Sequence, residues 1–447
     1  MTFENVKSAT LTFLVLLSLF LTWELWTFQP DYALLKEAEY VENTKISEER
    51  SLTDIIAPQQ VILHNNEDVA SLDLNDVLFE ELYEQLVATN VEDLTVVSWD
   101  LASPLKSQSI EFVYPTSIPA EVILNMFPNI GEDTILPTES VDRLILYHVT
   151  TKDKIHLRMV SYEEQVSFDF ATSFSIGDFQ NVYLAKASEF IPVFSYEKRN
   201  DDYERFTKHI YLPSEETEYP ILTYTTTAIS VDVFKQILFS DLLSVKKFRQ
   251  EGGNESYTDG NRMINVSGRG LYMNYINPIS SEGHNRSGKH GVLSSIEFIN
   301  GHGGWTDDYV LANWSSTMVD EEAQFRLRIN HIPVMRMGGQ DTMLLSVTRT
   351  GNQTSGYSRP LFDLDYTPIG DATRSKTLHS GYDVLSQLED QEAIDLEQIE
   401  DIRIGYEMTK NNAYITVSPF WFMKYGGYWQ KIKLDEPTKE VDDYGLE

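Results

Sequence analysis

The sequence predicts an α+β protein, in which a single N-terminal transmembrane helix precedes a multidomain extracellular region of antiparallel sheets and packed helices. One long apolar run stands near the start of the chain. After it, helical and alternating apolar patterns are mixed without a regular order, which favours antiparallel sheets over a parallel α/β fold. The roughly 420 residues that follow the run exceed what one hydrophobic core usually holds, so we expect two or three domains.

The apolar run covers residues 8–23, and apolar residues just beyond it extend it to about the 20 residues that cross a bilayer core. The run is followed by Trp23-Glu24-Leu25-Trp26, where a cleaved signal peptide would carry small residues, so we expect an uncleaved anchor. Lys7 precedes the run and acidic residues follow it, which favours a cytoplasmic N-terminus. We therefore predict a cytoplasmic tail at 1–7, a transmembrane helix at 8–28 and an extracellular remainder, in a single-pass protein of the cell membrane.

A stripe of small side chains along the predicted anchor is a candidate contact with another membrane helix. At about 100° per residue, one third of the helix circumference holds Ser8, Thr12, Val15, Ser18 and Thr22. Close packing of helices in a bilayer favours small, hydroxyl-bearing faces of this kind. The pattern fits equally well with hydroxyls that only bond the backbone of their own helix.

The composition restricts the partners and the chemistry of the chain. Its formal net charge of −34 argues against binding to nucleic acid, because the phosphates would be repelled over much of the surface. The chain has no cysteine, which excludes disulfides, thiolate nucleophiles and zinc–thiolate sites. An exported protein of this size without cysteine is typical of a Gram-positive bacterium.

The first part of the extracellular region predicts a helix above a sheet. Residues 29–55 are polar and predict a juxtamembrane linker, and residues 56–190 an N-terminal ectodomain. Leucines at every fourth position from Leu74 to Leu86 predict an amphipathic helix capped by Asp73. The predicted strands are 94–99, 110–114, 143–149 and 155–160, with a hairpin loop at 150–153.

Two further domains are predicted, a middle domain at 191–285 and a C-terminal domain at 286–434, followed by an acidic tail at 435–447. In the middle domain a helix should begin at Ser230 and present Phe234, Ile237, Leu238 and Leu242 on one face. In the C-terminal domain a helix should end at Gly301, and Pro419 should end the last hairpin. The predicted strands of the two domains are 263–266, 270–275, 325–329, 344–348, 402–408 and 413–417.

No segment carries a catalytic signature. Residues 300–305 place His302 among three glycines, but no nucleophile elbow, metalloprotease helix or phosphate loop accompanies them, so we expect a turn after a helix. His284, His290 and His302 lack a regular ligand spacing, and the acidic residues of 363–371 miss the EF-hand order. We therefore expect no enzymatic activity, catalytic residue, cofactor or metal site.

The densest aromatic patch of the chain lies at residues 420–429. Aromatic side chains on strands usually pack in a core, but they also concentrate binding energy at interfaces. Trp421, Tyr428 and Trp429 are therefore candidate partner-binding residues, with core packing as the alternative.

Several motifs resemble the YycH family, membrane-anchored regulatory proteins of Gram-positive Firmicutes. At the N-terminus they are Lys7-Ser8-Ala9-Thr10-Leu11, residues 16–19, Thr22-Trp23 and residues 26–30. Residues 298–305, 325–328 with Pro333-Val334, and 414–421 resemble the portion that YycH proteins share with their companion YycI, which makes 286–434 a YycI-like domain.

The resemblance implies a function that is not enzymatic. YycH proteins are accessory subunits of the histidine kinase YycG, also called WalK, and act through transmembrane and extracellular contacts together with a YycI-like partner. The alternative from the residues alone is an extracellular binding module for a cell-wall precursor or peptide.

Overall fold

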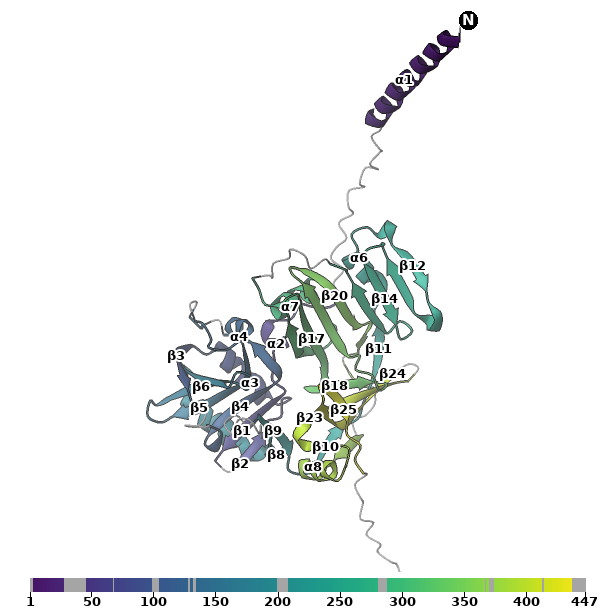
Figure 1. Cartoon of the computed structure of the whole chain (residues 1–447). Helices are drawn as coiled ribbons and strands as arrows, with labels where there is room; N and C mark the ends of the chain where they lie inside the picture. Colours follow the sequence, from purple (N-terminus) through teal and green to yellow (C-terminus); the bar gives the residue numbers. More distant parts are fainter. Residues whose placement is uncertain are drawn as a thin grey trace, which may run out of the picture. The chain divides into compact units, whose positions relative to one another are not determined.

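The computed structural model describes residues 3–27, 46–66, 68–98, 104–127, 129–131, 134–198, 208–279, 288–365, 367–369, 374–411 and 414–435. The chain divides into two units, Met1–Thr44 and Lys45–Glu447. The second unit is mixed α+β, as predicted, and its two large sheets are visible in Figure 1.

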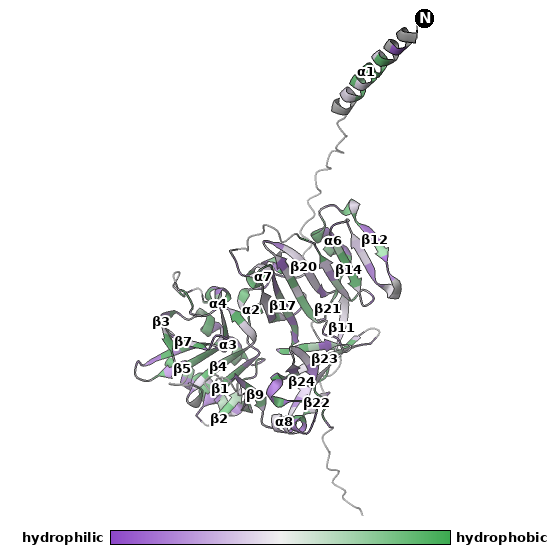
Figure 2. Cartoon of the chain, viewed as in Figure 1, coloured by the Kyte–Doolittle hydropathy of each residue, from purple (hydrophilic) through white to green (hydrophobic). Residues whose placement is uncertain are grey.

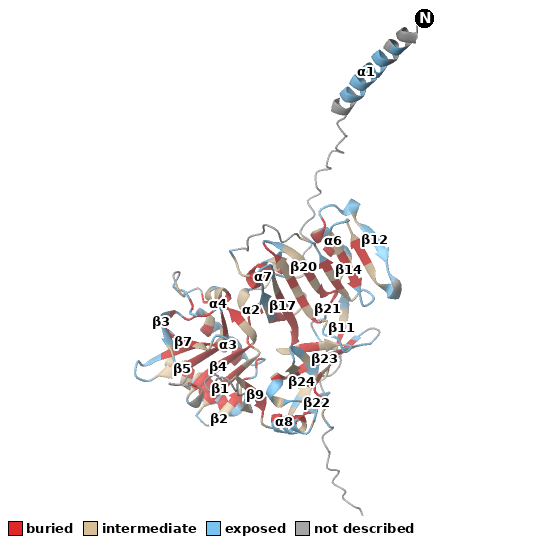
Figure 3. Cartoon of the chain, in the orientation of Figure 1, coloured by how far each residue is buried: buried red, intermediate tan, exposed pale blue. Residues whose placement is uncertain are grey.

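In the first unit the described residues, 3–27, form helix α1, Phe3–Thr27, where the sequence predicts a helix. The side chains described along it, Lys7 and residues 11–23, are exposed (Figure 3). Within the part of the chain that the structure describes, we find no helix with the length and apolar character needed to cross a membrane. The membrane span at 8–28 therefore stays a prediction.

The nine-stranded sheet of the second unit has the order β3-β7-β6-β5-β4-β1-β2-β8-β9, and its neighbouring strands are antiparallel. All four strands predicted in this region are present, and the hairpin loop at 150–153 is confirmed. The strands are β1 Gln60–Asn65, β2 Asp68–Ser71, β3 Val91–Val97, β4 Ser109–Pro119, β5 Ser140–Val149, β6 Lys154–Ser161, β7 Val166–Thr172, β8 Ile191–Lys198 and β9 Lys208–Pro213.

Short helices cover this sheet and share its core. They are α2 Leu52–Ile55, α3 Val77–Ala88, α4 Ala120–Met126 and α5 Ile176–Asp178. Helix α3 buries Leu78, Leu82 and Leu86, as the leucine spacing predicts. Its predicted cap is wrong: the amide of Leu78 donates to Asp76 at 2.8 Å, so the helix starts one turn later than expected.

The second sheet has 14 strands in the order β12-β13-β14-β15-β20-β19-β17-β18-β23-β24-β11-β21, with β16 beside β17 and β25 beside β24. Its strands are β11 Leu222–Ala228, β12 Lys246–Arg249, β13 Glu255–Thr258, β14 Met263–Ser267, β15 Tyr272–Ile276, β16 Tyr309–Ser316, β17 Asp320–Ile329, β18 Ile332–Met337, β19 Leu344–Thr350, β20 Gln353–Pro360, β21 Phe362–Leu364, β23 Ile399–Lys410, β24 Tyr414–Tyr425 and β25 Tyr428–Lys431. Figure 2 shows apolar residues along the strands of both sheets, and many of these residues are buried (Figure 3).

The remaining elements flank this sheet. A two-stranded sheet pairs β10 Thr217–Pro220 with β22 Ser375–Leu378. The longer helices are α6 Val231–Leu238, α7 Gly291–Gly301 and α8 Gly381–Glu389. Short 3₁₀ or π segments are η2 Pro104–Lys106, η3 Phe179–Tyr183, η4 Leu184–Glu189, η5 Leu242–Ser244, η6 Glu251–Gly253 and η7 Leu396–Gln398.

Three predicted helix and strand ends are corrected. Helix α6 begins after Ser230 as predicted, but Leu242 lies beyond it and is exposed. Gly301 is the last residue of α7, and the left-handed backbone that follows belongs to Gly303 and Gly304. Pro419 lies inside β24, between the stretches that pair with β11 and with β25, so its missing N–H interrupts neither ladder.

The predicted linker ends earlier than residue 55. Residues 28–45 lie outside the described part of the chain, but from residue 46 the chain belongs to the second unit and packs against its other residues. The amide of Ser47 donates to the carbonyl of Gly303 at 3.0 Å, and the amide of Arg50 to the Asn300 side chain at 3.1 Å. Ile55 is fully buried, so this segment belongs to the folded body.

The two sheets do not divide at the predicted boundaries. Strands β8 and β9 lie beyond residue 190 but extend the nine-stranded sheet. The strands on both sides of residue 285 belong to the 14-stranded sheet. The chain passes from the first sheet to the second after β9. The sequence did not predict this boundary, because strand pairing joins segments that lie far apart along the chain. The predicted acidic tail beyond residue 435 lies outside the described residues.

Candidate functional site

A cleft of about 520 Å³ lies where residues of the nine-stranded sheet face residues of the 14-stranded sheet. From the first sheet and its loops it is lined by Gln59, residues 115–117, Asp142 and Lys208. From the second it is lined by residues of β16, β17 and β23–β25, among them Arg326, Arg328, Asp401, Arg403 and Trp429. Sites of this kind often lie between two substructures, which makes the cleft the first candidate for ligand binding.

The charges of the cleft are arranged largely in pairs. Arg326 holds Asp341 with two bonds of 2.6 and 2.8 Å. Arg403 donates to Asp401 and to the side-chain oxygen of Gln59, which joins the two sheets at the cleft. Its guanidinium lies over the ring of Trp429, 4.3 Å from the centroid. The walls are therefore fixed in position by ion pairs and stacking.

Burial and charge shift the titration of several lining groups. Burial alone would raise the pKa of Asp401, but Arg403 and Lys208 outweigh it and lower that pKa. Burial lowers the pKa of Lys208, whose ammonium donates to the carbonyl of Glu400 at 3.4 Å. Burial, together with Arg328, lowers the pKa of His331 to about 4, so this imidazole is neutral at pH 7.

His331 reaches the cleft from a tight turn. Asn330 and His331 connect β17 to β18 with φ values of 48° and 63°, the conformation of a two-residue hairpin turn of type I′. The ring of His331 meets Phe79 of α3 edge-on at 5.6 Å, so the turn packs against the other sheet's helix. An Asn-His pair is a weak sequence signal for such a turn, so His331 was not among the predicted site residues.

The three predicted aromatic residues lie in different environments. Trp421 is 2% exposed and donates its indole N–H to the carbonyl of His379 at 3.1 Å. It belongs to the core, so we remove it from the expected docking surface. Tyr428 is 77% exposed and lies beside the half-buried Trp429 at the cleft, where partner binding by both stays a prediction.

The stripe on α1 also stays a prediction. The side chains of Thr12, Val15, Ser18 and Thr22 are exposed, and that of Ser8 lies outside the described side chains. Thr22 donates its hydroxyl to the carbonyl of Ser18 at 2.8 Å. This bond is the alternative considered from the sequence, in which the hydroxyl satisfies its own helix.

The segment 300–305 holds the chain together rather than presenting a reactive group. Trp305 is buried and donates its indole N–H to Asn300 at 2.6 Å. The His302 ring stacks on Phe298, and burial lowers its pKa. Gly304 lies against the backbone of Ser47, which belongs to residues 46–55, here called the N-terminal strap. The segment 300–305 therefore has a structural role, in keeping with the predicted turn.

The comparison with known families decides the classification. A family model for the YycH protein N-terminal domain matches residues 4–184, and one for the YycH protein C-terminal domain matches residues 207–439. The chain belongs to the YycH family. The predicted resemblance to the YycH family is therefore confirmed.

Known YycH proteins are similar over most of the chain. The chain is 24% identical over 473 aligned positions to the "Two-component system WalR/WalK regulatory protein YycH" of Bacillus subtilis strain 168, with 99% of each chain covered. A crystal structure of YycH from Bacillus subtilis superposes with a TM-score of 0.71 at 20% identity and covers 87% of this chain and 99% of that one. At this identity the second comparison shows a shared fold.

Proposed function

We propose that this chain is an accessory regulator of a WalK-type histidine kinase. The observation that supports it most is the match of both YycH domains, together with a relative named as a WalR/WalK regulatory protein that aligns over 99% of both chains. We propose that the chain has no catalytic activity, because the role named for that relative is regulatory.

The proposed regulator is anchored in the cell membrane by α1, with the N-terminus in the cytoplasm and the second unit outside. This placement rests on the apolar run at 8–23 and on the charges around it. The stripe of Ser8, Thr12, Val15, Ser18 and Thr22 would then contact a transmembrane helix of the kinase.

Substitutions on opposite faces of α1 test the transmembrane contact. Replacing Thr12, Ser18 and Thr22 together by leucine should leave the protein in the membrane fraction and abolish its effect on kinase output. Replacing Phe13, Leu17 and Phe20 by other large apolar residues is the control and should change nothing. If both sets of substitutions are tolerated equally, the regulatory contact with the kinase does not involve this stripe of α1 and must lie on the second unit.

For the extracellular partner, we propose that Tyr428 and Trp429 contact a YycI-like protein. Tyr428 is exposed beside the turn of the β24–β25 hairpin. Next to it, the guanidinium of Arg403 stacks on the ring of Trp429, and the guanidinium of Arg336 donates to the main-chain carbonyl of Trp429. An exposed tyrosine beside a fixed tryptophan is typical of a binding hot spot.

Tyr428→Ala should weaken co-purification with the YycI-like partner without lowering the melting temperature, because little of its side chain is buried. Tyr414→Ala is the matched control, since Tyr414, the first residue of β24, is also exposed, at 44%. An equal effect of both variants would contradict a specific contact at Tyr428.

The cleft favours a second function, the binding of a cell-wall precursor or peptide. It is large enough for a small ligand, and its lining combines five basic and four acidic side chains with the Trp429 ring. Fluorescence of Trp429 should change on addition of muropeptides, and Arg403→Met should remove the response. A response that survives in both Arg403→Met and Trp429→Phe would place the ligand elsewhere.

A further inference from the structure

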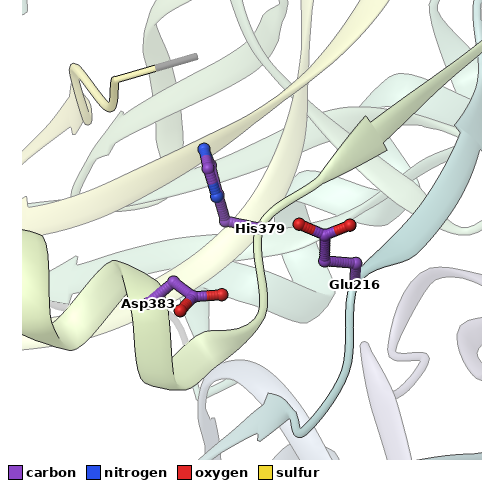
Figure 4. Close-up of side chains that lie close together, drawn as sticks. All are labelled: Glu216, His379 and Asp383. Carbon is purple, nitrogen blue, oxygen red and sulfur yellow. The ribbon is translucent and has the colours of Figure 1, made fainter. Parts of the chain in front are cut away.

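Three side chains on the second unit converge outside the cleft. Glu216, His379 and Asp383 each offer one ligand atom, and these atoms all lie within 4.8 Å of one another. Figure 4 shows the two carboxylates and the imidazole around a shared space, with Asp383 on a helix and Glu216 on a neighbouring loop. We propose that these three residues bind one divalent transition-metal ion.

Sheet register and a helix start bring the three residues together. Strands β10 and β22 are antiparallel with Thr217 opposite Leu378. Glu216 precedes β10 and His379 follows β22, so both residues lie at the same end of the pair. Helix α8 begins two residues after His379, and its first turn carries Asp383. The convergence therefore follows from the backbone arrangement and needs no movement of distant segments.

A hydrogen bond to the main chain orients the ring of His379. Its Nε2 lies 2.7 Å from the carbonyl oxygen of Asp435. A carbonyl oxygen only accepts, so Nε2 carries a proton and Nδ1 is the ring nitrogen left to bind an ion. Metal-binding histidines usually donate their second ring N–H to such an acceptor, which fixes the ring and raises its basicity.

The backbone around His379 and Gly381 is closely packed. The indole of Trp421 donates to the carbonyl of His379, and a Cβ on Gly381 would lie 2.4 Å from the Cβ of Leu212. The hydroxyl of Ser380 donates to Asp383 at 2.6 Å, which fixes the plane of that carboxylate. Two of the three ligands, His379 and Asp383, are held in this way, which lowers the entropic cost of binding an ion.

The donor set indicates the class of ion. Imidazole favours Zn²⁺ and neighbouring first-row metals, whereas carboxylates alone favour Ca²⁺ and Mg²⁺. One imidazole with two carboxylates fits Zn²⁺ or Mn²⁺, and the solvent-exposed position leaves room for water as further ligands. A bound ion would brace the loop between β9 and β10 against α8. This inference does not depend on the proposed regulatory function.

Calorimetric titration of the metal-free full-length chain tests the site, with ZnCl₂, MnCl₂, CaCl₂ and MgCl₂ as separate probes. We expect one Zn²⁺ or Mn²⁺ per chain at this site and at least tenfold weaker binding of Ca²⁺ and Mg²⁺. Glu216→Gln and His379→Gln should each reduce the affinity at least tenfold. Glu215→Gln removes the same charge from the adjacent exposed position and should change it less than twofold.

The melting temperature gives a second readout. Addition of the ion should raise it in the natural chain and in Glu215→Gln, but not in Glu216→Gln, whose exposed side chain leaves folding of the metal-free form unchanged. Absence of stoichiometric binding, or binding that Glu216→Gln and His379→Gln leave intact, would overturn the site. Tighter binding of Ca²⁺ or Mg²⁺ would overturn the assignment to a transition metal.

Discussion

At the scale of single residues, a buried ionic cluster holds the middle of the nine-stranded sheet. Glu111 is fully buried and accepts hydrogen bonds from Tyr211 at 2.6 Å and from Arg143 at 3.1 Å, with His64 at 3.3 Å. Burial opposes its ionisation, but His64, Arg143 and Tyr211 outweigh burial and lower its pKa. The cluster joins β1, β4, β5 and β9 on the face of the sheet opposite α3.

Glu111→Gln should lower the free energy of unfolding by about 3–5 kcal/mol, because it leaves the guanidinium of Arg143 buried without its charge partner. A folded pKa below the unfolded one stabilises the protein above the unfolded value and loses that stability as the pH falls. Urea denaturation at pH 7 and pH 4 should therefore show that the variant and the natural chain differ less in their free energy of unfolding at pH 4. Glu163→Gln, at an exposed turn, is the control and should have no effect.

Asp307 titrates in the opposite direction. Burial raises its pKa to about 7, so the folded state binds a proton that the unfolded state releases near pH 4. Stability from this group is present at low pH and is lost as the pH rises from about 4 to 7. Asp307→Asn keeps an oxygen for the amide of Leu364, which donates to Asp307 at 3.1 Å.

The Asp307→Asn variant should be more stable than the natural chain at pH 8 by about 1–3 kcal/mol, a range reduced from the full pKa shift because the residue is only half-buried. The advantage should shrink as the pH falls to 5. Guanidinium denaturation at the two pH values measures it. A constant difference at both would show that Asp307 does not titrate in this range.

At the scale of elements, the turn after α7 decides how the N-terminal strap is held. Gly304 has a φ of 76°, and a Cβ on it would lie 2.5 Å from the carbonyl oxygen of Ser47. Gly301, three residues earlier, ends the helix and has open space where a methyl group would lie. The two glycines therefore play different parts in one short segment.

Gly304→Ala should destabilise the protein by about 2–4 kcal/mol, since both the left-handed backbone and the contact with Ser47 oppose a side chain. Gly301→Ala should be neutral or stabilising by up to about 1 kcal/mol, because alanine is the better helix residue. Thermal denaturation of the pair separates the effects. Equal behaviour would contradict the assigned role of Gly304.

Local patterns predicted many elements but not their partners. Helical spacing located α3 and α6, because each buries one apolar face. It also located α7, although that helix buries residues on all sides, Ser294 and Ser295 included. Pro419 was misjudged since its tolerance depends on which strands lie beside β24, a property of distant pairing. Glu111 was not singled out because its polar side chain suggests an exposed face, whereas Tyr211 and Arg143 cover it.

At the scale of the whole molecule, the second unit includes the strap at residues 46–55, which the polar composition had assigned to a linker. A version of the protein that starts at Asp31 should melt at the same temperature as one that starts at Lys45. One that starts at Ala57 should melt several degrees lower, because it loses the buried Ile55 and the contacts of Ser47 and Arg50. Calorimetry of the three versions checks this. Identical melting temperatures would show that residues 46–55 belong to the linker, as the sequence predicted.

The candidate sites could not be predicted from the order of residues along the chain. The cleft combines Gln59 with Arg403 and Trp429, and the proposed metal site combines Glu216 with His379. Such spacings match no ligand motif, because sheet pairing rather than local order brings the residues together. The YycH family was predictable because its motifs at both ends of the chain are contiguous.

Regulation of a WalK-type kinase is tested most directly by the phosphorylation of its response regulator WalR in living cells. The level should change when the chain is deleted and return when it is restored. Restoration with Tyr428→Ala or with the leucine-substituted stripe should fail, although both variants reach the membrane in normal amounts. An unchanged level of phosphorylated WalR after deletion would contradict the proposed function.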